Sequence, residues 1–148
     1  MRWSIDSAAD RSAVAARFLV VVAFLIERDG CLLMLRRSAT RDHAPGEWEP
    51  GSGRVESGET PVEAVHREAR EETGLEVEIV GPVDTFHYHR GAAREEAIGI
   101  VFHCRALAGD VRLSAEHDAA RWVPLAGLAD VEGSEPLRGC LVRFALRR

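Results

Sequence analysis

Three glutamates, Glu68, Glu71 and Glu72, stand close together in the first half of the chain. Carboxylates this close raise one another's pKa unless a positive charge lies among them. A divalent cation supplies that charge, and ligands that are all oxygen favour a hard ion such as Mg²⁺ or Mn²⁺. Because Mg²⁺ commonly completes its coordination with water and substrate phosphates, the cluster indicates phosphate chemistry.

The segment that carries these acids is predicted to be a helix that begins near Pro61 and stops at Gly74. Thr60 can cap the first free N–H groups, Pro61 suits the first helical position, and Glu63 completes a capping box. Gly74 favours the left-handed conformation that closes a helix.

At about 100° per residue, the three acids occupy one arc of this helix. An apolar stripe borders the arc and consists of Val62, Val65 and Ala69. The outer face is expected to carry Glu63, Arg67 and Arg70. Acids that border the core side favour a cleft over open solvent. The alternative is a helix that is merely rich in Glu and Arg.

The spacing of the acids decides between these readings. The segment resembles the Nudix box, G-x5-E-x7-R-E-U-x-E-E-x-G-U with U aliphatic. Every fixed position is filled, by Gly53, Glu59, Arg67, Glu68, Glu71, Glu72 and Gly74. At roughly 7% usage per residue type, such a match arises by chance with a probability on the order of 10⁻⁸ per window. We therefore expect a member of the Nudix (MutT-like) hydrolase family.

The resemblance implies a fold and a reaction. The fold is α/β (α+β), an α/β/α sandwich around a mixed β-sheet. The reaction is Mg²⁺-dependent hydrolysis of a pyrophosphate bond in a nucleoside diphosphate-linked substrate, such as a normal or modified nucleoside triphosphate, by metal-activated water. Mn²⁺ is the expected substitute ion. Family members often dimerise, so a homodimer is a candidate assembly.

The resemblance also implies roles for individual residues. Glu68, Glu71, Glu72 and the backbone carbonyl of Ser52 would bind the metal, and Glu59 and Arg67 would hold these ligands in place. Glu116, in a loop ahead of a Trp-containing strand, is similar to a further ligand or general base of the family. An exposed loop acid is the alternative for Glu116, and a helix acid is the other candidate base. The expected catalytic residues are Glu59, Arg67, Glu71, Glu72 and Glu116.

Substrate contacts are less constrained. Arg54 could meet a phosphate or stay solvated, and Trp48, Phe86 and Tyr88 could define a base pocket. Trp48 could instead pack under its loop. Many relatives in the family have Pro-Gly-Gly before the box, whereas this chain has Pro50-Gly51-Ser52-Gly53. Since stacking on aromatic rings tolerates any base, the substrate stays open.

Composition bounds the remaining possibilities. The 148 residues, 46% of them hydrophobic, favour a single domain spanning 1–148. A net charge of −5 argues against general nucleic-acid binding. Because all 19 basic residues are arginine, a P-loop and a Schiff-base lysine are excluded. Three distant cysteines, no evident signal peptide and no apolar run long enough to span a bilayer predict a cytoplasmic protein with reduced thiols.

Hydrophobic patterns predict the other elements. Residues 18–26 form a strand buried on both faces, and Asp29-Gly30 turns the chain into a partner strand at 31–35. Residues 38–47 are a loop. Later strands are expected at 75–80, which Gly81-Pro82 would end, and at 85–89, 97–107 and 121–125, with loops at 90–96 and 114–118 and a helix at 137–146. Residues 1–17 are an arm or contain a short helix.

Two rival functions follow from the same residues. One is a non-catalytic nucleotide sensor of the same fold, which would bind a ligand without hydrolysing it. The other is a scaffold protein with a fortuitous box and no metal affinity. A complete set of acids argues against a pure binding module, since binding alone does not require all of them.

Overall fold

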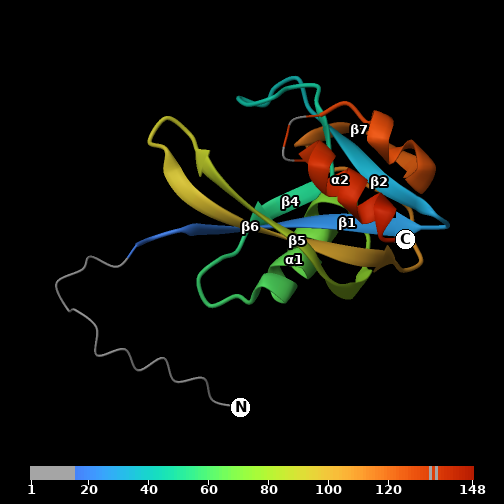
Figure 1. Ribbon diagram of the computed structural model, residues 1–148, viewed down its shortest axis with the longest axis horizontal. Helices are drawn as coiled ribbons and strands as arrows, with labels where there is room; N and C mark the ends of the chain where they lie inside the picture. The colour runs from blue at the N-terminus through green and yellow to red at the C-terminus, as the bar shows by residue number, and fades with distance from the viewer. Residues whose placement is uncertain (1–15, 134, 136) are drawn as a thin grey trace, which may run out of the picture.

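The computed structural model describes residues 16–133, 135 and 137–148. In this part of the chain, seven strands form one mixed sheet with helices on both faces (Figure 1). The strands are β1 (Leu19–Arg28), β2 (Cys31–Arg37), β3 (Trp48–Glu49), β4 (Gly51–Arg54), β5 (Val77–Arg90), β6 (Glu95–Ala106) and β7 (His117–Pro124). The helices are α1 (Pro61–Thr73), the 3₁₀ helix η1 (Leu125–Asp130) and α2 (Leu137–Leu146).

Strand β1 lies at the centre of the sheet and is buried on both faces, and its uninterrupted apolar sequence predicted that burial. It pairs in parallel with β6, and antiparallel with β2 at one end and β4 at the other. Its residues 21–26 are all buried. Because successive side chains of a strand point to opposite faces, β1 contributes to two separate cores.

The first core holds Val22 and Phe24 of β1 against Val65 and Ala69 of α1. The second holds Ala23 and Leu25 of β1 against residues of η1 and α2. Helices on both faces of a mixed sheet make the layered α/β/α arrangement, so the predicted fold class is confirmed. No described helix has the length and apolar character needed to cross a membrane.

Helix α1 begins and ends where the sequence predicts. The Glu63 N–H donates to the Thr60 hydroxyl at 3.2 Å, and the Thr60 N–H donates to the Glu63 carboxylate at 2.8 Å. Gly74 ends the helix with φ 71°, and its N–H donates to the Arg70 carbonyl at 2.9 Å. The capping box and the glycine thereby fix the register of the acids between them.

The prediction that Gly81-Pro82 ends a strand is wrong. Strand β5 runs through this dipeptide, with register shifts against β6 on either side of it. Proline lacks the N–H of a sheet ladder but is tolerated at edge strands and bulges, and β5 is the last strand of the sheet path. The loop predicted for 90–96 shrinks to a turn between β5 and β6.

Other observed boundaries also differ from the predicted ones. Strand β7 begins at His117, four residues before the predicted Arg121, because it pairs with β2 along its whole length. The segment that leads into the box contains the short strand β3, and β4 includes the first two residues of the box; neither strand was predicted. The expectation of an arm or helix in residues 1–17 falls on residues 1–15, outside the described part, while residues 16 and 17 have no regular structure.

Candidate active site

Two glycines of β4 lie so close to side chains of α1 and β1 that a Cβ atom would displace those side chains. A Cβ atom on Gly53 would lie 2.0 Å from Cδ of Glu68. A Cβ atom on Gly51 would lie 2.0 Å from the Phe24 ring and 2.8 Å from Oε2 of Glu72. Gly51 and Gly53 therefore leave the space that the carboxylates of Glu72 and Glu68 occupy.

Arg67 donates hydrogen bonds to several residues of the box. Its Nε and Nη2 donate to the two carboxylate oxygens of Glu59 at 2.7 and 2.9 Å, a bidentate pair. Nη1 donates to Glu68 at 2.7 Å and to Glu71 at 3.4 Å, and Nη2 also reaches the Arg54 carbonyl at 2.9 Å. The bonds from Arg67, joined by one from the Glu56 N–H, hold the pKa of Glu59 down to about 2.

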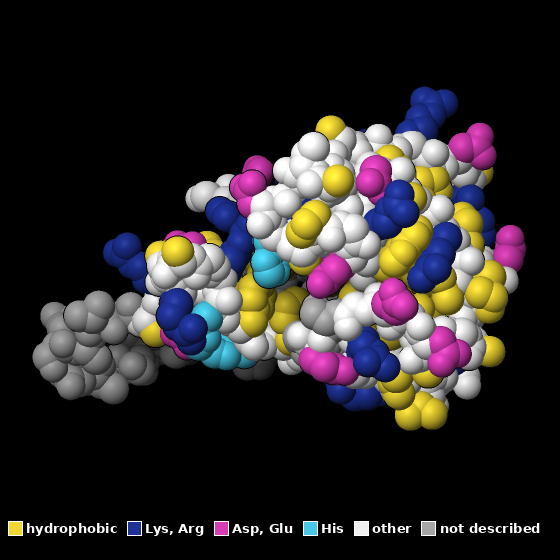
Figure 2. Space-filling view, turned by 90° about the horizontal axis from the view of Figure 1, so that it is seen from above, with side chains coloured by type: hydrophobic (Ala, Val, Ile, Leu, Met, Phe, Trp, Pro, Cys, Tyr) yellow, Lys and Arg dark blue, Asp and Glu magenta, His cyan; other side chains and the backbone are white. Residues whose placement is uncertain are grey.

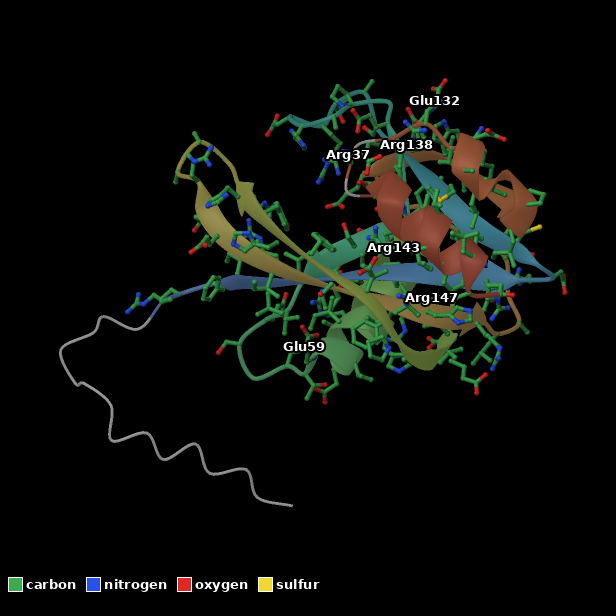
Figure 3. The ribbon with its side chains drawn as sticks, viewed as in Figure 1. Arg37, Glu59, Glu132, Arg138, Arg143 and Arg147 are labelled. Carbon is green, nitrogen blue, oxygen red and sulfur yellow. The ribbon has the colours of Figure 1, made fainter. Side chains whose placement is uncertain are left out.

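The outer-face position predicted for Arg67 is therefore wrong. Its side chain is only 24% exposed because it turns toward Glu59, which lies in the loop ahead of the helix. Glu59 and Arg143 of α2 lie on opposite sides of the sheet (Figure 3). The box network thus belongs to the α1 side of the molecule.

The three helix acids have different environments. Glu72 is 4% exposed, Glu68 has a side chain 15% exposed, and the Glu71 side chain is 59% exposed. Burial, followed by the charges of Glu68, Glu116 and Glu49, raises the pKa of Glu72 to about 9. Burial also raises the pKa of Glu68, although Arg67 opposes that shift. The positive charge near the two buried acids is thus too small to offset their burial and mutual repulsion.

Glu116 comes to the site through backbone bonds between its loop and α1. The Arg112 N–H donates to the Thr73 carbonyl at 2.7 Å, and the Ser114 N–H donates to the Glu72 carbonyl at 3.3 Å. The Glu116 charge contributes to the raised pKa of both Glu68 and Glu72. Its carboxylate pairs with Arg41 at 3.1 Å and is 48% exposed.

Glu49 also belongs to this acid group, although it was not among the predicted site residues. Its carboxylate accepts from Arg37 at 3.0 Å and lies 3.1 Å from Nε2 of His117, and its charge acts on Glu72. Among the described residues, Nδ1 of the buried His117 has no hydrogen-bond partner. The position of Glu49 between Trp48 and the glycines of β4 was the signal available in the sequence.

The charges of these acids suit a bound cation, but their side chains are not arranged as a complete metal site. In the described part of the chain, no three His, Cys, Asp or Glu side chains stand ready to hold a metal ion together. Arg67 accounts for part of this, because it binds Glu68 and Glu71. The Ser52 N–H donates to Glu72 at 3.2 Å, and this is the one hydrogen bond found for that carboxylate within the described residues. A buried acid with three acidic neighbours suits a divalent cation.

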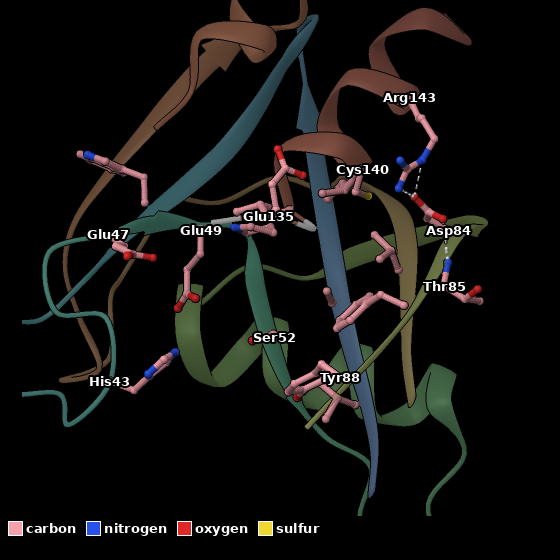
Figure 4. Close-up of a pocket in the computed structure, with 18 residues that line it drawn as sticks. His43, Glu47, Glu49, Ser52, Asp84, Thr85, Tyr88, Glu135, Cys140 and Arg143 are labelled. Atoms are coloured by element: carbon pink, nitrogen blue, oxygen red, sulfur yellow. Dashed lines mark hydrogen bonds and ion pairs between the residues drawn. The ribbon is translucent and has the colours of Figure 1, made fainter. Parts of the chain in front are cut away.

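A cavity of about 520 Å³ lies on the α2 face of the sheet, and its lining includes Glu49 and Ser52, the neighbours of Glu72. In the space-filling view, apolar side chains line a hollow bordered by acidic and histidine side chains (Figure 2). Glu49 and Ser52 line one part of it, and Asp84 and Arg143 another (Figure 4). A cavity of this size can enclose a small-molecule ligand.

The predicted aromatic residues meet in this cavity. Trp48, Phe86 and Tyr88 all line it, and the Phe86 and Tyr88 rings stack with centroids 5.5 Å apart. Trp48 also packs against the second core, and Arg121 lies 4.2 Å above its ring, so it serves both packing and the cavity wall. Arg54 is exposed and does not line the cavity. No pattern in the sequence points to Asp84 or Arg143, since α2 and β5 are distant along the chain.

Comparison with known proteins agrees with this geometry. The NUDIX domain model matches residues 16–143. The chain is 30% identical over 127 residues to nucleoside triphosphatase NudI of Enterobacter sp. (strain 638), covering 80% of this chain and 90% of that protein. It is 44% identical over 90 residues to the CTP pyrophosphohydrolase of Escherichia coli (strain K12), covering 61% of each.

Another relative is longer. An octanoyltransferase of Myxococcus xanthus is 41% identical over 99 residues, which cover 62% of this chain but only 26% of that protein. Among solved structures, the MutT protein of Methanosarcina mazei Go1 has a TM-score of 0.72 and 30% identity, covering 91% of this chain and 98% of that one. The chain belongs to the Nudix (MutT-like) hydrolases, enzymes that act on pyrophosphate bonds of nucleotide-type substrates.

Proposed function

We propose that this chain, as a single domain, hydrolyses nucleoside triphosphates to the nucleoside monophosphate and pyrophosphate with the help of Mg²⁺. The observation that carries the proposal is the buried Glu72 carboxylate, which is subject to the charges of Glu68, Glu116 and Glu49, together with a cavity that Glu49 and Ser52 line. The relatives named as a nucleoside triphosphatase and a CTP pyrophosphohydrolase support the same substrate class.

Glu68, Glu71, Glu72 and the Ser52 carbonyl would hold the metal, with Mn²⁺ as a substitute ion. When bound, the ion supplies charge neutralisation on the phosphates and a lower pKa for the attacking water. In the reaction, water forms a bond to phosphorus while the bridging P–O bond breaks and pyrophosphate leaves. Arg67 and Glu59 hold the acids in position through the bidentate pair and the bond to Glu68.

Glu116 is our first candidate for the group that accepts the proton of the attacking water. It is 48% exposed, so solvent reaches it, and its charge acts on both buried acids. The exposed Glu71 is the alternative base. The variants Glu116→Gln and Glu71→Gln distinguish the two candidates. The variant that lacks the base loses the increase in rate with pH that accompanies ionisation of the base, whereas the other variant keeps it.

The direct test is a panel of nucleoside triphosphates, nucleotide sugars and dinucleoside polyphosphates incubated with Mg²⁺, with both products identified by phosphorus NMR. The expected products from a triphosphate are the monophosphate and pyrophosphate. Binding of a nucleotide without hydrolysis, even after long incubation with Mg²⁺ or Mn²⁺, would instead indicate a sensor. Absence of any metal or nucleotide binding in calorimetry would indicate a scaffold.

A further inference from the structure

An ion pair forms part of the cavity wall where β5 meets α2. Arg143 donates from Nη2 and Nε to one oxygen of Asp84, Oδ2, at 2.6 and 3.0 Å. The backbone N–H of Thr85 donates to the other oxygen, Oδ1, at 2.9 Å. Both side chains line the cavity, and the close-up shows the two bonded to each other (Figure 4).

Among the described residues, the strong hydrogen bonds of Asp84 leave one acceptor position on its carboxylate. A carboxylate oxygen has about two lone-pair sites, so Oδ2 is filled by Arg143 and Oδ1 retains one beyond the bond from Thr85. Burial acts to raise the pKa of Asp84, but the bonds from Arg143 and the Thr85 N–H outweigh it and lower the pKa. The Cys140 thiol also contacts Asp84, but an S–H group is a weak donor that a stronger one can displace.

Sheet register sets the distance from this acceptor to the phosphate end. Ser52 on β4 pairs with Ala23 on β1, Ala23 pairs with Val101 on β6, and Val101 pairs with Asp84 on β5. All four residues line the cavity. Three steps between neighbouring strands amount to roughly 14 Å. This span is comparable to an extended nucleotide from its base edge to its outer phosphates.

The floor between the two ends suits a nucleoside. It is made of small or apolar side chains, Ala23 and Val101, with Phe86 and Tyr88 beside them. A base lying on this floor with its phosphates toward Ser52 and Glu49 would present its far edge to Asp84. An aromatic wall stacks on any base, so discrimination depends on the polar group at the far end.

We propose that Asp84, held in place by Arg143, reads the base by accepting a hydrogen bond from an exocyclic amino group, and that the cavity therefore selects nucleotides of cytosine or adenine over those of uracil or thymine. This rests on the proposed function for the phosphate end. An ionised carboxylate only accepts, so its remaining acceptor position pairs with an amino group, whereas a base carbonyl would leave that position unfilled next to a second acceptor, at an aspartate that is 20% exposed. Bidentate pairing with guanine needs both oxygens, and Oδ2 is already filled.

The test varies one substituent of the base. CTP, UTP and the triphosphate of the 2-pyrimidinone nucleoside share ring size, sugar and phosphates, and differ at position 4 in an amino group, a carbonyl and a hydrogen. The wild type should prefer CTP over UTP in kcat/KM by roughly 10-fold or more, with the 2-pyrimidinone between them. The Asp84→Asn variant, whose amide can donate as well as accept, should lose most of this preference.

Glu78→Gln is the matched control, since Glu78 lies on the same strand, is 61% exposed and does not line the cavity. It should keep the wild-type preference. Equal kcat/KM for CTP and UTP in the wild type would overturn the inference while leaving the proposed function intact, as would an unchanged preference in a folded Asp84→Asn. If no triphosphate is hydrolysed, the proposed function fails, and equilibrium binding of CTP against UTP then decides the inference: tighter CTP binding supports it and equal binding overturns it.

Discussion

Replacing Gly53 by alanine should inactivate the enzyme through one displaced carboxylate. The new Cβ would lie 2.0 Å from Cδ and 2.1 Å from Oε1 of Glu68. Non-bonded carbon atoms rest about 3.5 Å apart or more, so the Glu68 carboxylate must move by roughly 1.5 Å. A misplacement of about 1 Å in a catalytic group can cost about 100-fold in rate, so kcat/KM should fall at least about 100-fold.

The fold should survive this substitution. The φ angle of Gly53 is not in the left-handed region, so alanine brings no backbone strain. The atoms it meets belong to the end of a flexible side chain. The main loss is the bond from Arg67 to Glu68, and hydrogen bonds to charged groups contribute about 1.5–3 kcal/mol. A thermal unfolding curve should therefore show a cooperative transition at a moderately lower temperature.

Two other glycines provide controls for the Gly53→Ala measurement. Gly127→Ala meets only an ordinary contact of 3.7 Å with Val123 and should leave both activity and stability unchanged. Gly58→Ala meets nothing within 4 Å but stands at φ 81°, so it should lose about 1–2 kcal/mol of stability while keeping activity. Wild-type kcat/KM in Gly53→Ala would refute the view that its close approach positions Glu68.

Three further predictions concern Arg67, the buried Glu72 and the three cysteine thiols. Arg67→Lys keeps the charge but lacks the planar guanidinium that bonds Glu59 and Glu68 together, so activity should fall about 10–100-fold. Wild-type activity in this variant would contradict the role of Arg67 in positioning Glu68. Burial is the main cause that raises the pKa of Glu72 from 4.5 to about 9. With respect to this group, the metal-free fold is therefore most stable below pH 4.5, where Glu72 is protonated, and it loses this stability as the pH rises to about 9. Because Mg²⁺ requires the ionised acid, the rise in Tm on adding Mg²⁺ should be larger at about pH 8.5 than at about pH 6, and an equal rise would count against this. A thiol-alkylating reagent at about pH 8 should modify half-buried Cys31 first, as read by peptide mass spectrometry, because burial raises the thiol pKa of the other two; prompt modification of either would contradict their burial. These are Cys104, at about 12, and Cys140, at about 11.

Local signals in the sequence predicted the elements that depend on nearby residues. The capping box, the stop at Gly74 and the buried strand β1 depend on residues close in the chain or on an unbroken apolar run. The helix at 137–146 was likewise predicted with its observed bounds. The path of β5 through Gly81-Pro82 could not be predicted in this way, because it depends on pairing with β6 and on lying at the edge of the sheet.

The same distinction applies to the site. The box residues were found because their spacing along α1 and its preceding loop carries the signal. The inward turn of Arg67 was missed because helical periodicity does not include a partner in the loop ahead, Glu59. Asp84 and Arg143 are 59 positions apart and meet only through the packing of α2 on the sheet. Their role became visible once sheet register aligned Asp84 with Ser52.

The central claim is that buried acids on α1 hold the metal that drives hydrolysis, and Glu72→Gln tests it most directly. Glutamine preserves the size of the side chain and removes its charge, in a site where Glu72 is 4% exposed. With Mg²⁺ and a nucleoside triphosphate, pyrophosphate release should fall by orders of magnitude relative to the wild type while the unfolding transition is retained. Near-normal pyrophosphate release by a folded Glu72→Gln variant would contradict the account.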